Sequence, residues 1–236
     1  MENNYRLFCN YFSREIMNNT KSTTVKPNRI DAYGTAFSFL LFPLLFVAAQ
    51  FMHPDVFHLE VMTNGHQWLE HFRGESLLHL AHLLEFICAP LLVIMALHFK
   101  VVLREKSPVL SYVGVCMAFI GALMLLGNKS ALCLTISAFD TLSDTQILQI
   151  VPALDVMLRK ESYMFVLWLL PLLPLGYGLI GITLFKTRHV PRWQALLVTI
   201  GSLMLANPEI EVINFFASFV LAGGLIPYSI RLLKQA

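Results

Sequence analysis

Long apolar blocks, separated by polar loops, run through most of this chain. The first block covers residues 32–52, contains no charged residue and is long enough to cross a lipid bilayer as a helix. The apolar residues are continuous within each block rather than alternating, so the pattern predicts membrane helices. We expect six of them, at residues 32–52, 75–98, 108–128, 162–185, 192–207 and 208–230.

Parts of this pattern are less regular. Residues 129–161 combine a short apolar stretch with an amphipathic one, and we interpret them as a surface-lying or partly re-entrant hairpin. The fifth helix would extend only about 24 Å, against a hydrocarbon core of about 30 Å. Pro171 and Pro174 fall inside the fourth helix and predict a kink there.

The composition indicates a membrane protein with one main domain. Hydrophobic residues make up 56% of the chain, which is too much for an ordinary soluble domain. The net charge of +2 is too small to indicate a nucleic-acid partner, so the lipid bilayer is the expected partner. Residues 1–31 are polar and lack the apolar core of a signal peptide. They form either a short interfacial helix or a frayed tail, ahead of a transmembrane domain at residues 32–236.

Lysine and arginine are unevenly divided between the predicted loops. Thirteen lie in the N-terminal segment, in the loops after the second and fourth helices and at the C-terminal end, whereas four lie in the other loops. Because cytoplasmic loops carry an excess of these residues, both termini are expected in the cytoplasm. The sequence therefore predicts an all-α, six-helix transmembrane bundle.

Five ionisable residues share one face of the second predicted helix. They are His71, Glu75, His79, His82 and Glu85. At about 100° per residue they form one polar stripe. Glu85 is expected about 15 Å below Glu75, near the bilayer midplane, where a lipid-facing carboxylate costs several kcal/mol. Its side chain must therefore face protein or water.

Two interpretations of the polar stripe stay open. In the functional one, the stripe relays protons or binds a cation, a transition metal or haem. In the structural one, a protonated Glu85 bonds to a neighbouring helix, and His79 and His82 bond to backbone or serine groups. The loop before the helix either adds ligands or is simply solvated. Its candidate ligands are His53, Asp55, His58, Glu60, His66 and Glu70.

A second polar group follows the short fifth helix, at Asn207, Glu209 and Glu211. Because that helix is short, these residues are candidates for an outward-opening polar cavity, completed by Arg73 and Lys129. The alternative is an exposed acidic turn, in which Glu209 lies in the first turn of the sixth helix, where a carboxylate favours the helix dipole.

No catalytic motif accompanies these residues. The chain contains no HExxH, CxxC, GxSxG, P-loop or GxGxxG motif. His66 and His71 are five residues apart, so they do not share a helix face as the HExxH pair does. An enzyme is therefore the least favoured class of function.

Three short sequences resemble parts of a known family. They are Leu84-Glu85, SYVG at residues 111–114 and VPRW at residues 190–193. Their order and spacing resemble a bacterial family of six-helix integral membrane proteins described as a domain of unknown function, over roughly residues 30–234. The resemblance implies a bacterial inner-membrane location and the six-helix plan. It implies no activity and no site residues.

Three functional hypotheses follow. The leading one is a protein that binds a cation, metal or haem through the polar stripe, which opens to the outer face. The second is a proton-coupled transporter of a small solute, in which Glu85 is the proton site and the prolines of the fourth helix supply a hinge. The third is a structural membrane subunit.

Overall fold

The computed structural model describes residues 29–54, 56–57, 64–207 and 210–236. These residues form helices and turns, with no β-strand among them, which confirms the all-α prediction. The long helices are α2 (Arg29–Phe51), α4 (Ser76–Leu103), α5 (Pro108–Asn128), α8 (Leu172–Thr187), α9 (Arg192–Met204) and α10 (Glu211–Gln235). The shorter segments are α3 (Gly65–Phe72), the π-helix η1 (Lys129–Leu134), α6 (Thr135–Phe139), α7 (Asp144–Leu158) and the 3₁₀-helix η2 (Ser162–Leu169).

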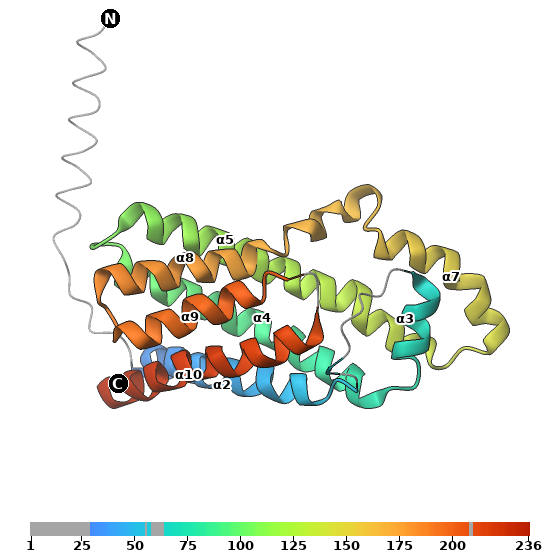
Figure 1. Cartoon of the computed structure of the whole chain (residues 1–236), viewed down its shortest axis with the longest axis horizontal. Helices are drawn as coiled ribbons and strands as arrows, with labels where there is room; N and C mark the ends of the chain where they lie inside the picture. The colour runs from blue at the N-terminus through green and yellow to red at the C-terminus, as the bar shows by residue number, and fades with distance from the viewer. Residues whose placement is uncertain (1–28, 55, 58–63, 208–209) are drawn as a thin grey trace, which may run out of the picture.

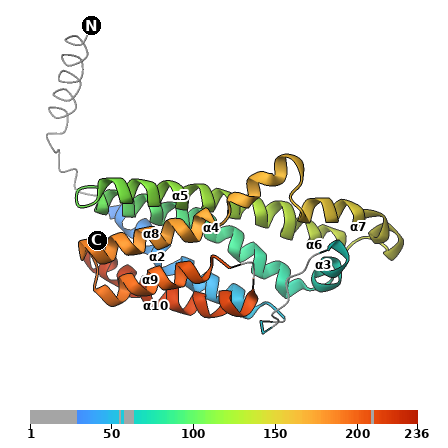
Figure 2. The same ribbon diagram turned by 45° about the horizontal axis from the view of Figure 1, so that its top comes forward.

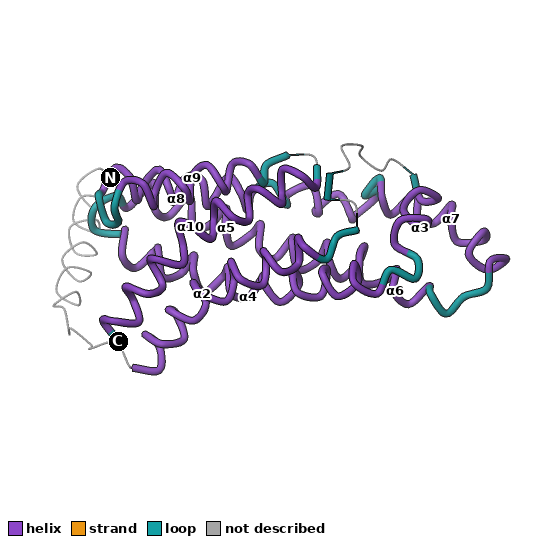
Figure 3. The backbone as a smooth tube through the Cα atoms, turned by 60° about the horizontal axis from the view of Figure 1, so that its bottom comes forward, coloured by secondary structure: helices purple, strands orange, loops and turns teal. Residues whose placement is uncertain are grey.

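The six long helices form a closed ring. Helix α2 packs against α4 and α10, α5 packs against α4 and α8, and α9 packs against α8 and α10 (Figure 1). The tube in Figure 3 shows these helices running along the long axis of the molecule. We call the end with the C-terminus and the α4–α5 and α8–α9 loops the basic end. The opposite end, where α2 finishes and α4 begins, is the histidine end.

Glycine residues allow α5 and α8 to approach closely. A Cβ atom at Gly176 would lie 2.3 Å from the backbone nitrogen of Ala118 and 2.7 Å from the carbonyl oxygen of Gly114. A Cβ atom at Gly121 would lie 2.4 Å from the Cα atom of Leu173. Membrane helices associate through small residues in this way, because lipid tails are as apolar as the helix surfaces.

Aromatic rings fill the inside of the ring of helices. Phe39 of α2 lies edge-on to Phe99 of α4 and to Tyr228 of α10, with ring centroids 5.1 and 4.9 Å apart. All three side chains are buried. Edge-to-face contacts of this kind are favourable and fix the separation of the helices that carry them.

Among the residues that the structure describes, five helical segments are long and apolar enough to cross a membrane. They are α2, α4, α5 with its extension to Phe139, η2 with α8, and α10. Helix α9 has 13 residues, which gives a length of about 20 Å against a hydrocarbon core of about 30 Å. The predicted six helices are therefore present in the ring, but the fifth is too short to count as a span. The predicted break in the fourth is present, since η2 ends at Leu169 and α8 begins after Pro171.

The histidine end extends beyond the ring (Figure 2). Helix α5 continues through η1 into α6, so residues 129–139 prolong a ring helix rather than starting a separate hairpin. The physical reason is that no glycine or proline follows Asn128 before Asp140 to end the helix. Helix α7 then packs with α3 around a second apolar core. Its buried members include Trp68, Phe72, Leu78, Ile136, Ile147 and Leu154.

Two predictions fall on residues that the structure does not describe. The interfacial helix or tail was placed within residues 1–31, of which only Arg29, Ile30 and Asp31 are described, as the start of α2. In the histidine-rich loop, Asp55, His58 and Glu60 lie outside the described residues, as does Glu209 before α10.

Candidate functional site

The polar stripe begins on two helices rather than one. Helix α4 starts at Ser76, and Gly74 adopts a φ of +76°, a left-handed conformation that glycine accepts readily and that ends α3 before α4 starts. His71 therefore belongs to α3, and Glu75 is the exposed residue directly before α4, without a capping hydrogen bond from its side chain. The prediction of one continuous stripe is wrong for His71, although His79, His82 and Glu85 do lie on α4.

Helix α3 is capped at its N-terminal end and tied there to α7. The Asn64 side chain accepts a hydrogen bond from the backbone N–H of Gln67, and the backbone N–H of Gly65 donates to Asp155 of α7 at 2.6 Å. Trp68 and Phe72 turn inward into the second core. His71, on the same short helix, is placed beside the start of α10.

Glu85 is the most enclosed charge at the histidine end. Its side chain is buried, and the amide of Gln50 at the end of α2 donates a hydrogen bond of 2.9 Å to Oε1. The ammonium group of Lys129 forms an ion pair with Oε2. Three segments of the chain therefore meet at one carboxylate. Taking such a pair out of water is costly unless hydrogen bonds complete it, which Gln50 does here.

Lys129 reaches Glu85 from an irregular part of the α5 helix. It is the first residue of the π-helix η1, whose i to i+5 hydrogen bonds widen the turn. Single π-helical turns inside longer helices are rare and are frequently found at functional sites. The sequence analysis placed Lys129 near the outer cavity but did not predict its contact with Glu85.

His82 lies one turn above Glu85 and is packed between rings. Its imidazole is stacked on Phe72 with centroids 5.1 Å apart and meets the edge of His53 at 5.4 Å. The Nδ1 atom of His82 is buried and has no hydrogen-bond partner among the described residues. His53 Nδ1 lies 3.0 Å from the carbonyl oxygen of Ala49. Since a carbonyl can only accept, His53 donates from Nδ1.

His79 forms the outer contact of the same helix face. Its Nε2 atom lies 3.0 Å from Oδ2 of Asp140, which follows α6. The other oxygen of Asp140 accepts from the backbone N–H of Gly74 at 3.0 Å. Asp140 thus ties the start of α4 to the end of α6. Sequence reasoning missed it, because the lack of a helix-ending residue after Asn128 does not show that the extension of α5 brings residue 140 beside residue 79.

The second polar group meets the first through His71. The Nε2 atom of His71 lies 3.8 Å from Oε1 of Glu211, at the first residue of α10. Asn207 instead organises the turn, because its side chain donates to Asn214 at 2.8 Å and accepts from the backbone N–H of Ile210 at 2.6 Å. The structure therefore brings Glu211 to the polar stripe and gives Asn207 a local structural role.

The structure places Glu85 beside the end of α2. Gln50 lies about 32 Å along α2 from Arg29, and Glu85 lies about 27 Å along α4 from Leu103. The first turns of α4 project past the end of α2. Helix length alone does not fix where the bilayer boundary falls, so the midplane position of Glu85 stays a prediction.

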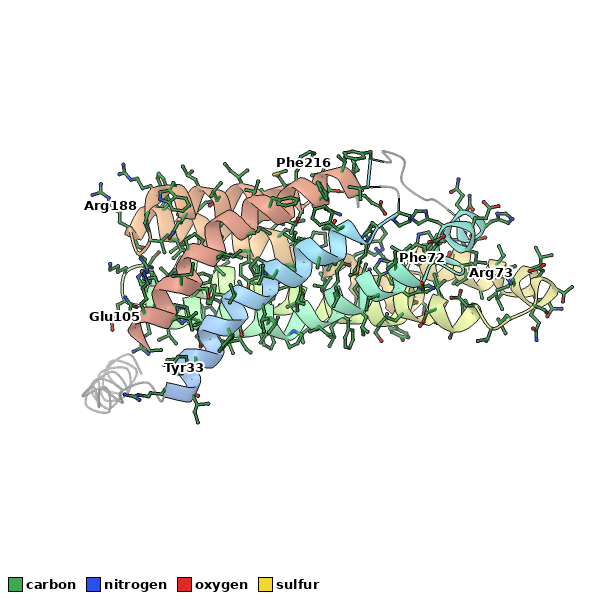
Figure 4. The ribbon with its side chains drawn as sticks, turned by 90° about the horizontal axis from the view of Figure 1, so that it is seen from below. Tyr33, Phe72, Arg73, Glu105, Arg188 and Phe216 are labelled. Carbon is green, nitrogen blue, oxygen red and sulfur yellow. The ribbon has the colours of Figure 1, made fainter. Side chains whose placement is uncertain are left out.

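The structure gathers pairs rather than a cluster of metal ligands. Among the residues that it describes, no group of three or more histidine, cysteine, aspartate or glutamate side chains is arranged to hold a metal ion. The stripe residues instead pair with partners on other elements: His79 with Asp140, His71 with Glu211, and Glu85 with Lys129. Figure 4 shows this end of the molecule by its labelled residues Phe72 and Arg73.

Comparison with protein families gives a match along most of the chain. Residues 35–228 match the family described as Domain of unknown function (DUF4386). The chain belongs to this family. The DUF4386 match starts within α2 and ends within α10, so it covers the whole ring of helices and includes Glu85, Lys129 and the VPRW loop. Neither the curated proteins nor the solved structures gave a match.

Proposed function

We propose that this DUF4386 protein is a bacterial inner-membrane protein that binds protons at the histidine end and couples their binding to movement of its helices, as a proton-coupled transporter of a small solute does. The excess of lysine and arginine at the basic end supports a cytoplasmic location for that end, with both termini inside. The histidine end then faces outward.

The observation that carries this proposal is the ion pair between Glu85 and Lys129. It joins α4 to the π-helical extension of α5, and both groups are largely withdrawn from solvent. A proton on Glu85 would cancel the attraction between its carboxylate and the Lys129 ammonium. Breaking a buried ion pair by removing one of its charges costs about 3–5 kcal/mol, which is enough to favour a different arrangement of the two helices.

The histidines supply a path for the proton. His79, His82 and Glu85 follow one another at three-residue intervals on α4, with His79 beside the surface carboxylate Asp140. His82, between them, has a buried ring nitrogen with no protein partner among the described residues. Imidazole gains and loses protons near neutral pH, so this order suits a relay from Asp140 to Glu85.

The cation, metal or haem hypothesis is the alternative. The position beside Glu85 that such a cation would take is occupied by the ammonium group of Lys129. We therefore prefer the proton. The alternative is tested by metal analysis and visible absorption of protein purified in mild detergent. Stoichiometric metal or a Soret band that is lost in the His79→Ala/His82→Ala variant would replace our proposal.

Proton-coupled transport is tested in proteoliposomes loaded with the pH indicator pyranine. Gradients of amino acids, sugars, nucleosides and monovalent cations are applied one at a time, and proton flux is followed. We expect one of these solutes to drive a flux that Glu85→Gln abolishes. The matched control is Glu75→Gln, which removes the exposed carboxylate at the start of the same helix and should leave the flux intact. Unaltered flux in Glu85→Gln would remove the transport proposal.

The structural-subunit hypothesis makes a different prediction for the same variants. In that case no solute drives a proton flux in either protein. The substitutions at Glu85 and Lys129 would then change thermal stability or the recovery of partner proteins and nothing else.

A further inference from the structure

The basic end carries an open cleft of about 510 Å³ between the α8–α9 loop and the end of α10. It is lined by Arg188, His189, Val190, Pro191, Arg192 and Arg231. The VPRW sequence thus contributes part of the lining. Figure 4 places the labelled Arg188 at this end, far from Phe72 and Arg73. The cleft is therefore separate from the proton site proposed above.

Two of the three arginines, Arg192 and Arg231, are positioned by contacts that leave their charges available. The Arg192 guanidinium lies over the ring of Phe185 at 5.5 Å, and that of Arg231 lies over Tyr228 at 4.9 Å. Arg231 also donates to the carbonyl oxygen of His189 at 3.3 Å. Stacking on a ring holds a guanidinium in one orientation and lets its remaining N–H groups reach an anion.

The backbone of Arg188 is held in an unusual conformation. Its φ is +51°, the left-handed region in which a side-chain-bearing residue is disfavoured, and it ends helix α8. Glycine is the usual residue at such a helix end. Backbone strain of this kind clusters at functional sites, which is consistent with a use for the guanidinium itself.

The arginines of the cleft carry charge that is not paired within the described part of the chain. Arg188, Arg192 and Arg231 form no ion pair with an aspartate or glutamate that the structure describes. The pKa of His189 lies below its ordinary value. Burial is the larger cause, and the positive charges of Arg231 and Lys106 add to it. The cleft is thus a concentration of positive charge whose counter-charge must come from outside this part of the chain.

An apolar surface leads away from the cleft along α9. Trp193 follows Arg192 directly, and Leu196, Ile200 and Leu203 continue the same face at helical spacing, all four exposed. Tryptophan is enriched where the headgroups of a bilayer meet its hydrocarbon core. A soluble phosphate compound has no apolar part to contact this surface. A phospholipid has a phosphate and then acyl chains, in the same order as the arginine cleft and the apolar face of α9.

We propose that the arginine cleft binds the phosphate group of an anionic phospholipid, whose acyl chains lie along the exposed apolar face of α9. Arginine clusters at the cytoplasmic surface recognise such headgroups through charge-assisted, bidentate hydrogen bonds. The lipid would also cover the helix that is too short to span the bilayer alone.

Fluorescence quenching by brominated lipids tests this proposal. The Trp68→Phe/Trp168→Phe variant keeps Trp193 as its single tryptophan, beside the cleft. It is reconstituted with brominated phosphatidylglycerol or with brominated phosphatidylcholine. We expect phosphatidylglycerol to associate on the order of a hundredfold more strongly and Arg188→Gln and Arg192→Gln each to reduce that preference about fivefold. The charge-matched control, Arg104→Gln at the same end but outside the cleft, should keep it.

Each other result overturns a defined part of the proposal. Equal quenching by the two lipids would remove the site. An equal loss in Arg104→Gln would reduce it to the general attraction of a basic surface. If inorganic phosphate added in excess displaced phosphatidylglycerol from Trp193, the cleft would be a site for a free phosphate compound and the lipid would not be its ligand.

Discussion

The two ends of the helix ring carry ionisable groups in opposite ways. At the histidine end, charged side chains pair with other groups of the protein. Glu85 pairs with Lys129, and Asp140 pairs with His79. At the basic end, Arg188 and Arg192 surround an open cleft and form no ion pair among the described residues. Both ends are built on the same six helices.

The difference separates charges that act on the protein from charges that act on a ligand. An internal ion pair is sensitive to a single proton, because protonating one member leaves the other unpaired in a poorly solvated place. Removing one solvated arginine that has no ion-pair partner changes the stability of the protein little. Several such arginines together attract an anion. We therefore expect substitutions at the histidine end to alter stability and those at the basic end to alter binding.

The largest effect is expected from Lys129→Met. It leaves the Glu85 carboxylate buried without a counter-charge, and the free energy of unfolding should fall by about 3–5 kcal/mol. The Glu85→Gln/Lys129→Met variant removes both charges and should recover most of that loss. Lys160→Met is the matched control, because its ammonium lies over the Trp168 ring at 4.5 Å and its loss should cost no more than about 1 kcal/mol. Chemical denaturation in detergent measures the free energy of unfolding of all three variants. Equal losses in Lys129→Met and Lys160→Met would contradict the role given to the Glu85–Lys129 ion pair.

A smaller effect is expected from Asp140→Asn. This change weakens the acceptor of both His79 and the backbone of Gly74, and we expect a loss of about 1–2 kcal/mol. Asp144→Asn provides the control, because Asp144 pairs with Arg73 at 2.8 Å but its side chain is 88% exposed. Exposed pairs contribute at most about 1 kcal/mol. Thermal denaturation that ranks Asp144→Asn as the more damaging would refute the role given to Asp140.

Much of the fold could be predicted from the sequence, because the apolar blocks are long and bounded by polar loops. The helices at 32–52, 75–98 and 108–128 were found within a few residues of α2, α4 and α5. What could not be predicted was how far α4 and α5 extend past the ring. A hydropathy pattern locates apolar length, but it does not show where the bilayer boundary falls along a helix that is longer than the hydrocarbon core.

The candidate site was predicted only in part, for the same reason. Spacing along one helix correctly grouped His79, His82 and Glu85. The partners Gln50, Lys129 and Asp140 come from other helices, and a single sequence carries no signal for contacts between distant segments. Gln50, a polar residue at the end of an uncharged block, was the one visible hint.

At the basic end, Arg188→Asn should leave stability nearly unchanged. Asparagine tolerates the left-handed backbone better than arginine does, and the arginine has no ion-pair partner among the described residues to lose. We expect the midpoint of thermal denaturation to stay the same or to rise slightly, while the preference for phosphatidylglycerol falls. A large loss of stability would place this arginine in the same class as Lys129.

The smallest effect is expected from His189. Burial, and then the charges of Arg231 and Lys106, keep its pKa below the ordinary value, so the folded protein binds this proton less readily than the unfolded chain. Its contribution to stability is therefore complete above about pH 6.5 and is lost as the pH falls below that value. His189→Gln should flatten this part of a stability–pH curve. If His189 does not contribute, the stability–pH curve of the His189→Gln variant should be as steep as that of the unsubstituted protein.

The emission of Trp68 as a function of pH tests the proton site most directly. Trp68 stacks on Phe72 at 4.7 Å, and Phe72 stacks on His82 at 5.1 Å, so a single-tryptophan protein (Trp168→Phe/Trp193→Phe) reports on that imidazole. We predict an emission change on acidification that His82→Gln abolishes, Glu85→Gln displaces along the pH axis and Glu75→Gln leaves in place. Emission that does not change with pH, or that changes identically in all three variants, would contradict proton binding at the histidine end.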